Sequence, residues 1–262
     1  MITNNQSECD RGQSTVIGFV LIIGILIVML SFAVIAEKSV QTENEITHNE
    51  QVDRAMINLQ SDTQTATAST QQTSIISSEV DYSKGLLYSS IPKKSFNVEK
   101  SGSQKTAEIS YSDGIGSSQT ITEQSDSLRI EKEYSYITNV QYTLEHSLIY
   151  RQSNGDVLIT RPLLFPNDSA IVIQNQDVTV TDANPTVMNA RITASESEQE
   201  INPSSDVTYK IETETPRSEV ERQIDNSSKS HITNVERNGD FIVFTLEQKN
   251  YTIITQEIDI EE

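Results

Sequence analysis

Histidine and cysteine are the first residues to consider for catalysis or metal binding, and their spacing in this chain predicts neither. The three histidines, His48, His146 and His231, lie far apart in the sequence, and no two have the His-x-x-x-His spacing of a helical zinc site. The single cysteine, Cys9, leaves no cysteine pair for a disulfide or a metal cluster. Neither a phosphate-binding loop nor a Gly-x-Ser-x-Gly elbow is present. We therefore predict a protein that is not an enzyme and has no cofactor or metal.

Clustered carboxylates are a second kind of candidate, because hard cations take several oxygen ligands. Glu196, Glu198 and Glu200 alternate along one stretch, and residues 259–262 read as an acidic C-terminal tail. No Asp-x-Asp-x-Asp-Gly calcium loop accompanies either group. We predict that the alternating glutamates guard an exposed sheet edge, where charge discourages pairing with another strand. A cation site there is the alternative.

Modification is a third kind of chemistry that the sequence offers. Asn167, Asn226 and Asn250 each begin an Asn-x-Ser/Thr acceptor for N-glycosylation. Asn250 falls inside a candidate strand, where a glycan is hardest to attach. These positions make a glycoprotein one expectation for the exposed part of the chain.

The charge of the chain excludes one class of function. Its 262 residues include 38 Asp+Glu and 19 Lys+Arg, for a formal charge of −19. A nucleic-acid-binding surface needs an excess of Lys and Arg, so we predict no nucleic-acid partner. An acidic, polar surface stays soluble where salt screens repulsion, so a halophilic source is one hypothesis. An ordinary acidic surface protein is the other.

A long apolar run, residues 16–35 (VIGFVLIIGILIVMLSFAVI), contains no charged residue. Any domain outside the cell would be attached to the membrane through it. A helix of about 20 residues, rising about 1.5 Å per residue, spans the ~30 Å apolar core of a bilayer. The run therefore predicts a single transmembrane helix, or an apolar helix that is buried in an assembly.

The residues before this run determine how the helix is processed. A secretory signal has an apolar core of about 7–15 residues followed by a small-residue cleavage site. Here the core is longer, and the small residue stands before it, in Arg11-Gly12-Gln13. This pattern resembles a type IV prepilin leader. The resemblance implies that a prepilin peptidase cuts after Gly12 and leaves the helix on a mature chain that begins at Gln13. Many pilins carry an early glutamate, whereas residues 15–17 are uncharged here. An uncleaved signal anchor is the alternative.

The helix is expected to continue beyond the apolar run, because residues 37–60 contain no proline or glycine. Val52, Ala55, Met56 and Leu59 lie at i, i+3, i+4 and i+7, which places them on one helical face. Apolar residues are sparse below Val52. We therefore expect packing only near the C-terminal end of this stalk, and a fully solvated stalk is the alternative. The next residues, 60–74, read as a helix end that passes into a linker.

Beyond residue 74 the sequence is typical of strands and turns. Asn154-Gly155 and Asn238-Gly239 predict two hairpins, and the second should pair Val235 with Ile242. That register places Val235, Ile242, Phe244 and Leu246 on one buried face. A loop is expected over 113–126 and a helix over 216–225, PRSEVERQID. The further strand candidates are 75–82, 95–100, 105–112, 127–144, 169–181, 187–195, 205–214 and 250–258. The predicted fold is α+β: a long N-terminal transmembrane and stalk helix, then an antiparallel β-sandwich-like domain.

The order of these segments is similar to that of a haloarchaeal family of pilin-like membrane proteins. The residues that carry the resemblance are the leader, NEQVDRAMINLQS at 49–61 and HSLIYRQSNGDVLITRPLLF at 146–165. It implies four parts, namely a leader (1–12), a transmembrane or assembly helix (13–36), a polar stalk and linker (37–74), and an extracellular β domain (75–262).

Two functions fit this layout. The leading hypothesis is a type IV pilin-like surface structural protein, a minor pilin or pseudopilin subunit. Its partners would be membrane lipid, the prepilin peptidase and other pilin-like subunits through residues 16–36. The alternative is a permanently anchored monomeric binding module, a receptor or adhesin.

Overall fold

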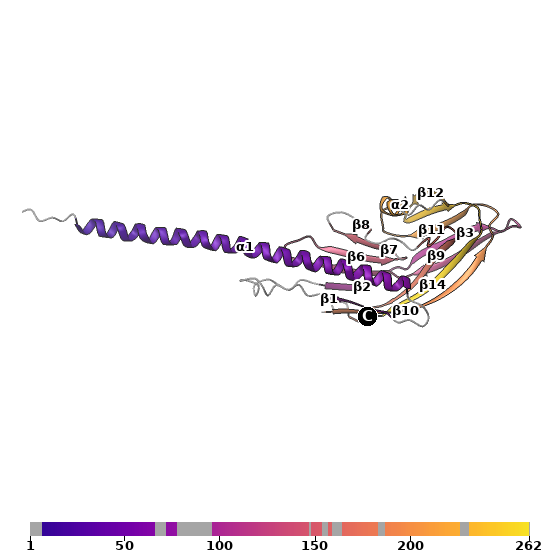
Figure 1. The fold of residues 1–262 in the computed structure, drawn as a ribbon, viewed down its shortest axis with the longest axis horizontal. Coiled ribbons are helices and arrows are strands. Elements are labelled where there is room, and N and C mark those ends of the chain that lie inside the picture. The colour runs from indigo at the N-terminus through magenta and orange to yellow at the C-terminus, as the bar shows by residue number, and fades with distance from the viewer. Residues whose placement is uncertain are drawn as a thin grey trace, which may run out of the picture.

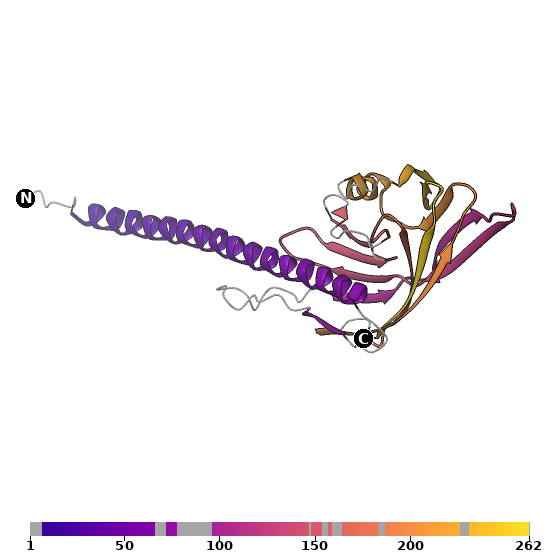
Figure 2. The same cartoon turned by 45° about the vertical axis from the view of Figure 1, so that its right-hand side comes forward.

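The computed structural model describes residues 7–65, 72–77, 96–146, 148–153, 157–158, 164–182, 187–225 and 231–261. Its first element, helix α1 (Ser7–Thr65), contains 59 residues and is therefore about 90 Å long. Figures 1 and 2 show its N-terminal half projecting away from a β domain, while its C-terminal end lies along the strands. The continuous helix from the apolar run into the polar stalk is thus confirmed.

In the part of the chain that the structure describes, the β domain contains three sheets and one short helix, α2 (Arg217–Asp225). The central sheet contains, in spatial order, β1 (Gln72–Ser77), β10 (Val187–Ile201), β14 (Tyr251–Glu261) and β9 (Ala170–Thr179). The distal sheet contains β12 (Ile232–Asn238), β13 (Phe241–Leu246), β11 (Val207–Glu212), β3 (Lys105–Ser112) and β4 (Ser118–Ser125). The helix-side sheet contains β2 (Phe96–Lys100), β5 (Leu128–Lys132), β6 (Val140–Glu145), β7 (Leu148–Gln152) and β8 (Val157–Leu158).

The predicted fold class is confirmed, with one exception in strand direction. Every described strand pair is antiparallel except β9 and β14, which run parallel over ten residue pairs from Ala170–Thr252 to Thr179–Glu261. Parallel neighbours cannot be joined by a tight turn, and here most of the distal sheet lies between them in sequence. The expectation of purely antiparallel pairing is wrong at this pair.

Two hydrophobic cores pack on opposite faces of the central sheet. Successive side chains of a strand point to opposite faces. In β14, Tyr251 and Ile253 enter the core against the distal sheet, whereas Ile258 and Ile260 enter the core against α1 and the helix-side sheet. At the start of β14 the odd-numbered residues are therefore buried against the distal sheet, and at its end the even-numbered residues are buried against α1 and the helix-side sheet. The central sheet thus joins the helix-bearing half of the domain to the distal half.

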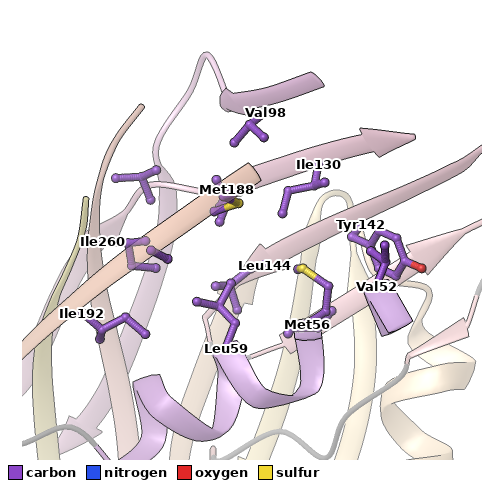
Figure 3. Packing of buried hydrophobic residues seen from close by; sticks show 14 of the residues in the cluster. Val52, Met56, Leu59, Val98, Ile130, Tyr142, Leu144, Met188, Ile192 and Ile260 are labelled. Atoms are coloured by element: carbon purple, nitrogen blue, oxygen red, sulfur yellow. The ribbon is translucent and has the colours of Figure 1, made fainter. Parts of the chain in front are cut away.

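Helix α1 contributes Val52, Met56 and Leu59 to the first of these cores. Figure 3 shows these three side chains pointing toward residues of the helix-side sheet and of the central sheet. All three are at most 1% exposed. The predicted apolar stripe is confirmed, with Ala55 partly buried beside it.

The loop predicted over 113–126 is mostly a strand. Residues 113–117 form the turn, and β4 pairs with β3 from Ser112–Ser118 to Lys105–Ser125. This strand has only one large apolar residue, Ile121, so the sequence has no alternation of apolar and polar residues from which to predict it. The strand predicted over 127–144 is two strands, β5 and β6, separated by residues 133–139. Helix α2 agrees with the helix predicted over 216–225.

The second predicted hairpin has the right buried face and the wrong register. Val235 pairs with Phe244, and Arg237 pairs with Ile242, because Gly239 and Asp240 form the loop in place of Asn238 and Gly239. A shift of two residues keeps every side chain on its face. Ile242, Phe244 and Leu246 are accordingly buried, with Val235 packed against them. In the first hairpin, β7 pairs with β8 as predicted, whereas Asn154 and Gly155 lie outside the described residues.

Gly239 determines this register, and replacing it by alanine should cost about 1–2 kcal/mol of unfolding free energy. Its φ is +62°, and no atom lies within 4 Å of the Cβ that alanine would add. The cost would therefore come from backbone strain alone, at the first loop position where a type II′ turn favours glycine. Urea unfolding followed by circular dichroism measures it. Gly102→Ala is the control, since Gly102 has no positive φ and equally open surroundings. Equal effects of the two changes would contradict this account.

Candidate functional site: the apolar helix and its attachment

Among the described residues, α1 is the one helix that is long and apolar enough to cross a membrane. None of its most apolar 18-residue stretch is buried in the protein. Large side chains from Phe19 to Ile35 are 43–68% exposed. The polar side chain of this stretch, Ser31, donates its hydroxyl to the carbonyl oxygen of Ile27 at 2.8 Å. The surface of residues 18–36, which we name the apolar segment, therefore offers a neighbour only hydrocarbon.

The residues of the predicted cleavage site lie in the same helix. The helical backbone begins at Ser7, so Arg11, Gly12 and Gln13 lead into the apolar segment without a break. Gly12 and Gln13 precede the first exposed apolar side chain of the segment, Phe19, by six to seven residues. Both residues therefore lie on the N-terminal side of the apolar segment.

The second half of α1 is buried along a stripe that begins much earlier than the sequence suggested. Glu37, Gln41, Glu45 and His48 are at most 8% exposed, and Val52, Met56, Leu59 and Thr63 continue the same face. Their spacing of four, four and three residues follows the helical period. The expectation of packing only near the C-terminal end is wrong, because the lower part of the stripe is polar and hydrophobic patterning does not detect it. The buried stripe starts one residue after the apolar segment ends.

Glu45 is the centre of the attachment. Its Oε1 accepts the backbone N–H of Ser135 at 2.8 Å, and its Oε2 accepts those of Tyr136 at 2.7 Å and Ile137 at 3.0 Å. The side chain of Glu45 is fully buried. Hydrogen bonds to an ionised carboxylate are stronger than neutral ones. The β5–β6 connection thus forms a cradle of three amides around one carboxylate of the helix.

Two further polar contacts continue the attachment up the helix. His48 Nδ1 lies 2.9 Å from the hydroxyl of Tyr134. One turn later, Asp53 accepts hydrogen bonds from the hydroxyl of Tyr142 and from Arg151 Nη1, each at 2.8 Å. Burial raises the pKa of Tyr142, and the charge of Asp53 raises it further, so its hydroxyl stays protonated and donates. We name Glu45, His48 and Asp53 with these partners the polar clamp.

Glu45 and His48 stand at Glu-x-x-His spacing, which can supply two metal ligands on one helix face. Here both side chains contact the β domain instead. No group of three or more His, Cys, Asp or Glu side chains that could hold a metal ion occurs among the described residues.

The other two histidines, His146 and His231, do not lie beside His48 in the fold. His146 lies in the turn between β6 and β7 at a φ of +45°, and burial lowers its pKa to about 4. His231 is buried beside the rings of Phe165 and Tyr251, and its Nδ1 lies 3.5 Å from Asp168 Oδ1. Each histidine is therefore packed in a different part of the fold.

Of the candidate glycosylation residues, two are exposed and one lies outside the described part of the chain. Asn167 is exposed, and its Oδ1 accepts the backbone N–H of Ser169 at 2.8 Å. Asn250 is exposed immediately before β14, so its predicted place inside a strand is wrong. Asn226 is the one that is not described.

The alternating glutamates 196, 198 and 200 lie exposed on β10, as predicted. β14 pairs with β10 along residues 191–201, whereas β1 pairs only with residues 187–192. In the described chain, residues 193–201 therefore form a charged sheet edge. The residues predicted to form an acidic C-terminal tail are part of a strand instead, because Asp259 and Glu261 belong to β14 and pair with β10.

The β domain has a polar cleft of about 820 Å³ between β4 and the ends of β9 and β14. Its lining includes Glu123, Asp126, Asp177, Glu257 and Asp259, opposed by Lys100. Lys100 pairs with Asp126 and lies 3.6 Å from Asp177. Burial raises the pKa of Glu123, and the carboxylate of Glu257 raises it further. The cleft is therefore predominantly acidic.

A long helix with a bare apolar half, clamped to a β domain, defines this molecule as a β-domain protein with one candidate membrane span among the described residues. Residues 11–261 match the model of a family described as "Family of unknown function (DUF7289)", and the chain belongs to that family. No curated protein matches the chain, and no solved structure matches it.

Proposed function

We propose that this chain is a type IV pilin-like structural protein of the cell surface, a minor pilin or pseudopilin subunit anchored by its apolar segment. The observation that carries the proposal is the bare apolar segment, which follows Arg11-Gly12-Gln13 and ends directly before the buried stripe begins at Glu37. A helix this apolar is stable only in lipid or against other apolar helices.

The clamp supports a structural role in a second way. Glu45, His48 and Asp53 attach the β domain to the helix by side-chain contacts. In a subunit of an assembly, such an attachment transmits the position of the helix to the outer domain. A signal anchor that merely retains a domain at the membrane has no need of it.

In this proposal the N-terminus is cytoplasmic and the β domain is extracellular. Membrane lipid and a prepilin peptidase are the first partners, and other pilin-like subunits follow through residues 16–36. The acidic surface favours a halophilic source, and the resemblance to the haloarchaeal family implies an archaeal one. Asn167 and Asn250 are the described positions where a glycan would be attached.

The mature protein purified from its native membrane is expected to begin at Gln13. Edman sequencing or N-terminal mass spectrometry determines this start, and Gly12→Leu should abolish processing because it removes the small residue before the cut. Gly18→Ala is the matched control, since no atom lies within 4 Å of the added Cβ. An intact Met1 in the unmodified protein would refute the pilin-like proposal.

The second candidate function is a permanently anchored binding module, and the acidic cleft favours it. Its complement would be a small ligand that carries positive charge, because Lys100 is the one basic side chain in the described lining and faces five carboxylates. Titration calorimetry of the solubilised protein with spermidine tests this function. Binding that Glu257→Gln weakens, together with an intact Met1, would replace the first proposal by the second.

A further inference from the structure

The outward face of α1 carries a shallow groove of about 440 Å³ directly above the apolar segment. It is lined by Ile35, Lys38, Ser39, Thr42, Glu43 and Ile46, all on the helix itself. Ile35 is 66% exposed and Ile46 is 46% exposed. Ile35 belongs to the apolar segment and Ile46 lies beyond it, so exposed apolar side chains continue along this face above the segment.

The spacing of the groove residues is that of a coiled-coil seam. Ile35, Ser39, Thr42 and Ile46 follow one another at four, three and four residues, which is the d–a–d–a order of a heptad. The small residues Ser39 and Thr42 form the hollow between the two isoleucines. The hydroxyl of Thr42 donates to the carbonyl oxygen of Lys38 at 2.8 Å, so this donor needs no hydrogen-bond acceptor on a neighbouring helix.

Charge identifies the occupant of this groove. Lys38 precedes the seam residue Ser39, and Glu43 follows the seam residue Thr42, so they take the flanking g and e positions. In a parallel, in-register pair of helices, a g residue faces the e residue five positions later on the partner. Lys38 of each copy would then face Glu43 of the other, twice by symmetry. An antiparallel pair would lose this match, and a shared membrane orientation excludes it.

We propose that a second copy of this chain packs in parallel on the groove formed by Ile35, Lys38, Ser39, Thr42, Glu43 and Ile46. The inference rests on the proposed membrane anchoring and not on cleavage or filament formation. Both copies stand in one membrane, so their grooves lie at the same height. The buried stripe occupies the opposite side of α1 at this level, because Glu37, Gln41 and Glu45 are the buried residues there. The described part of the β domain therefore leaves the groove open to a second helix.

Disulfide cross-linking in native membranes tests this contact. In a Cys9→Ser background, Ser39→Cys should form a dimer under mild oxidation, because it lies in the seam. Thr47→Cys is the matched control, since Thr47 is exposed on the same helix next to Ile46 but outside the seam. Equal dimer yields from the two positions would mean random collision in the membrane and would overturn the proposal.

A charge exchange tests the register independently. Adding Lys38→Glu to the Ser39→Cys chain brings a second carboxylate against Glu43 of the other copy and should reduce the dimer about threefold or more. Adding Glu43→Lys as well restores the opposite charges and should restore the dimer. Failure of the double change to do so would overturn the in-register pair even if Ser39→Cys cross-links. A start at Met1 with these results intact would refute prepilin processing and leave the pair standing.

Discussion

Replacing Glu45 by alanine is expected to raise the hydrogen-exchange rates of the Ser135, Tyr136 and Ile137 amides by about 100-fold. The carboxylate accepts all three N–H groups at 2.7–3.0 Å in a fully buried position. Alanine would take the acceptor from three N–H groups, which belong to one exposed and two half-buried residues, and an unpaired donor shielded from water costs about 1–3 kcal/mol unless the connection opens. Opening is the less costly outcome, since residues 133–139 are a connection between strands and not part of a sheet. Exchange mass spectrometry of the solubilised protein measures this local opening.

Glu50→Ala provides the control for this experiment. Glu50 is on the same helix, but its carboxylate is exposed and lies 3.8 Å from Arg54, a distance at which surface ion pairs contribute little. Exchange of the three amides should be unchanged in that variant. Glu45→Gln keeps two acceptor lone pairs and loses the charge, so its effect should lie between the two. If Glu45→Ala left the three amides protected, the cradle would not be what attaches the domain.

The polar clamp also shows why sequence patterning found only half of the buried helix face. Val52, Met56 and Leu59 are apolar, so their spacing was sufficient to predict that they are buried. Glu37, Gln41 and Glu45 continue the same four-four-three spacing, but their side chains are typical of solvent-exposed helices. A search for periodicity without regard to polarity would have extended the stripe. Nothing in the sequence places the amides of residues 135–137 opposite Glu45, because that contact joins segments 90 residues or more apart.

The strands show the same boundary between local and long-range information. The β12–β13 hairpin was predictable because Gly239 and the flanking Val and Phe residues are all local, although the loop began one residue later than expected. The parallel pairing of β9 with β14 was not predictable, because it joins residues 82 positions apart and no turn sequence links the two strands. Strand β4 was missed because its burial pattern is almost wholly exposed or intermediate. The acidic cleft depends on β4 and β14 together, so the sequence could not reveal it.

Glu145 is a buried carboxyl group that sequence reasoning also passed over, and its role is to join two sheets. It ends β6, and its Oε1 accepts the hydroxyl of Thr213 and, at 2.9 Å, the backbone N–H of Glu214 in the connection from β11 to α2. Its Oε2 is buried without a hydrogen-bond partner in the described structure. Burial raises the pKa of Glu145 above its ordinary 4.5, and the hydrogen bond from Thr213 opposes this rise only in part. The folded protein therefore holds a proton here that the unfolded chain releases at lower pH.

The sign of the pH dependence follows from that difference. Below about pH 4.5 both states carry the proton, and Glu145 contributes its full stabilisation. As the pH rises toward the pKa of the folded state, the unfolded chain loses its proton first, so the contribution of Glu145 falls. Glutamine resembles the protonated acid and cannot titrate. The difference in unfolding free energy between Glu145→Gln and the unmodified chain should therefore grow in favour of the variant from pH 4 to pH 7.

Alanine at the same position should have the opposite effect at every pH. It removes the acceptor of Thr213 and of the Glu214 amide, and it opens a cavity between two sheets, for an expected loss of about 3 kcal/mol or more. Urea unfolding at pH 4, 5, 6 and 7 separates the two variants, with Glu133→Gln as the control because Glu133 is exposed. His146, whose pKa burial lowers to about 4, loses stabilising effect as the pH falls, but it is common to all variants and cancels in the differences. A Glu145→Gln curve that stays parallel to that of the unmodified chain would mean that Glu145 is ionised in the fold. The junction of the two sheets would then rest on a charged hydrogen bond and not on a neutral acid.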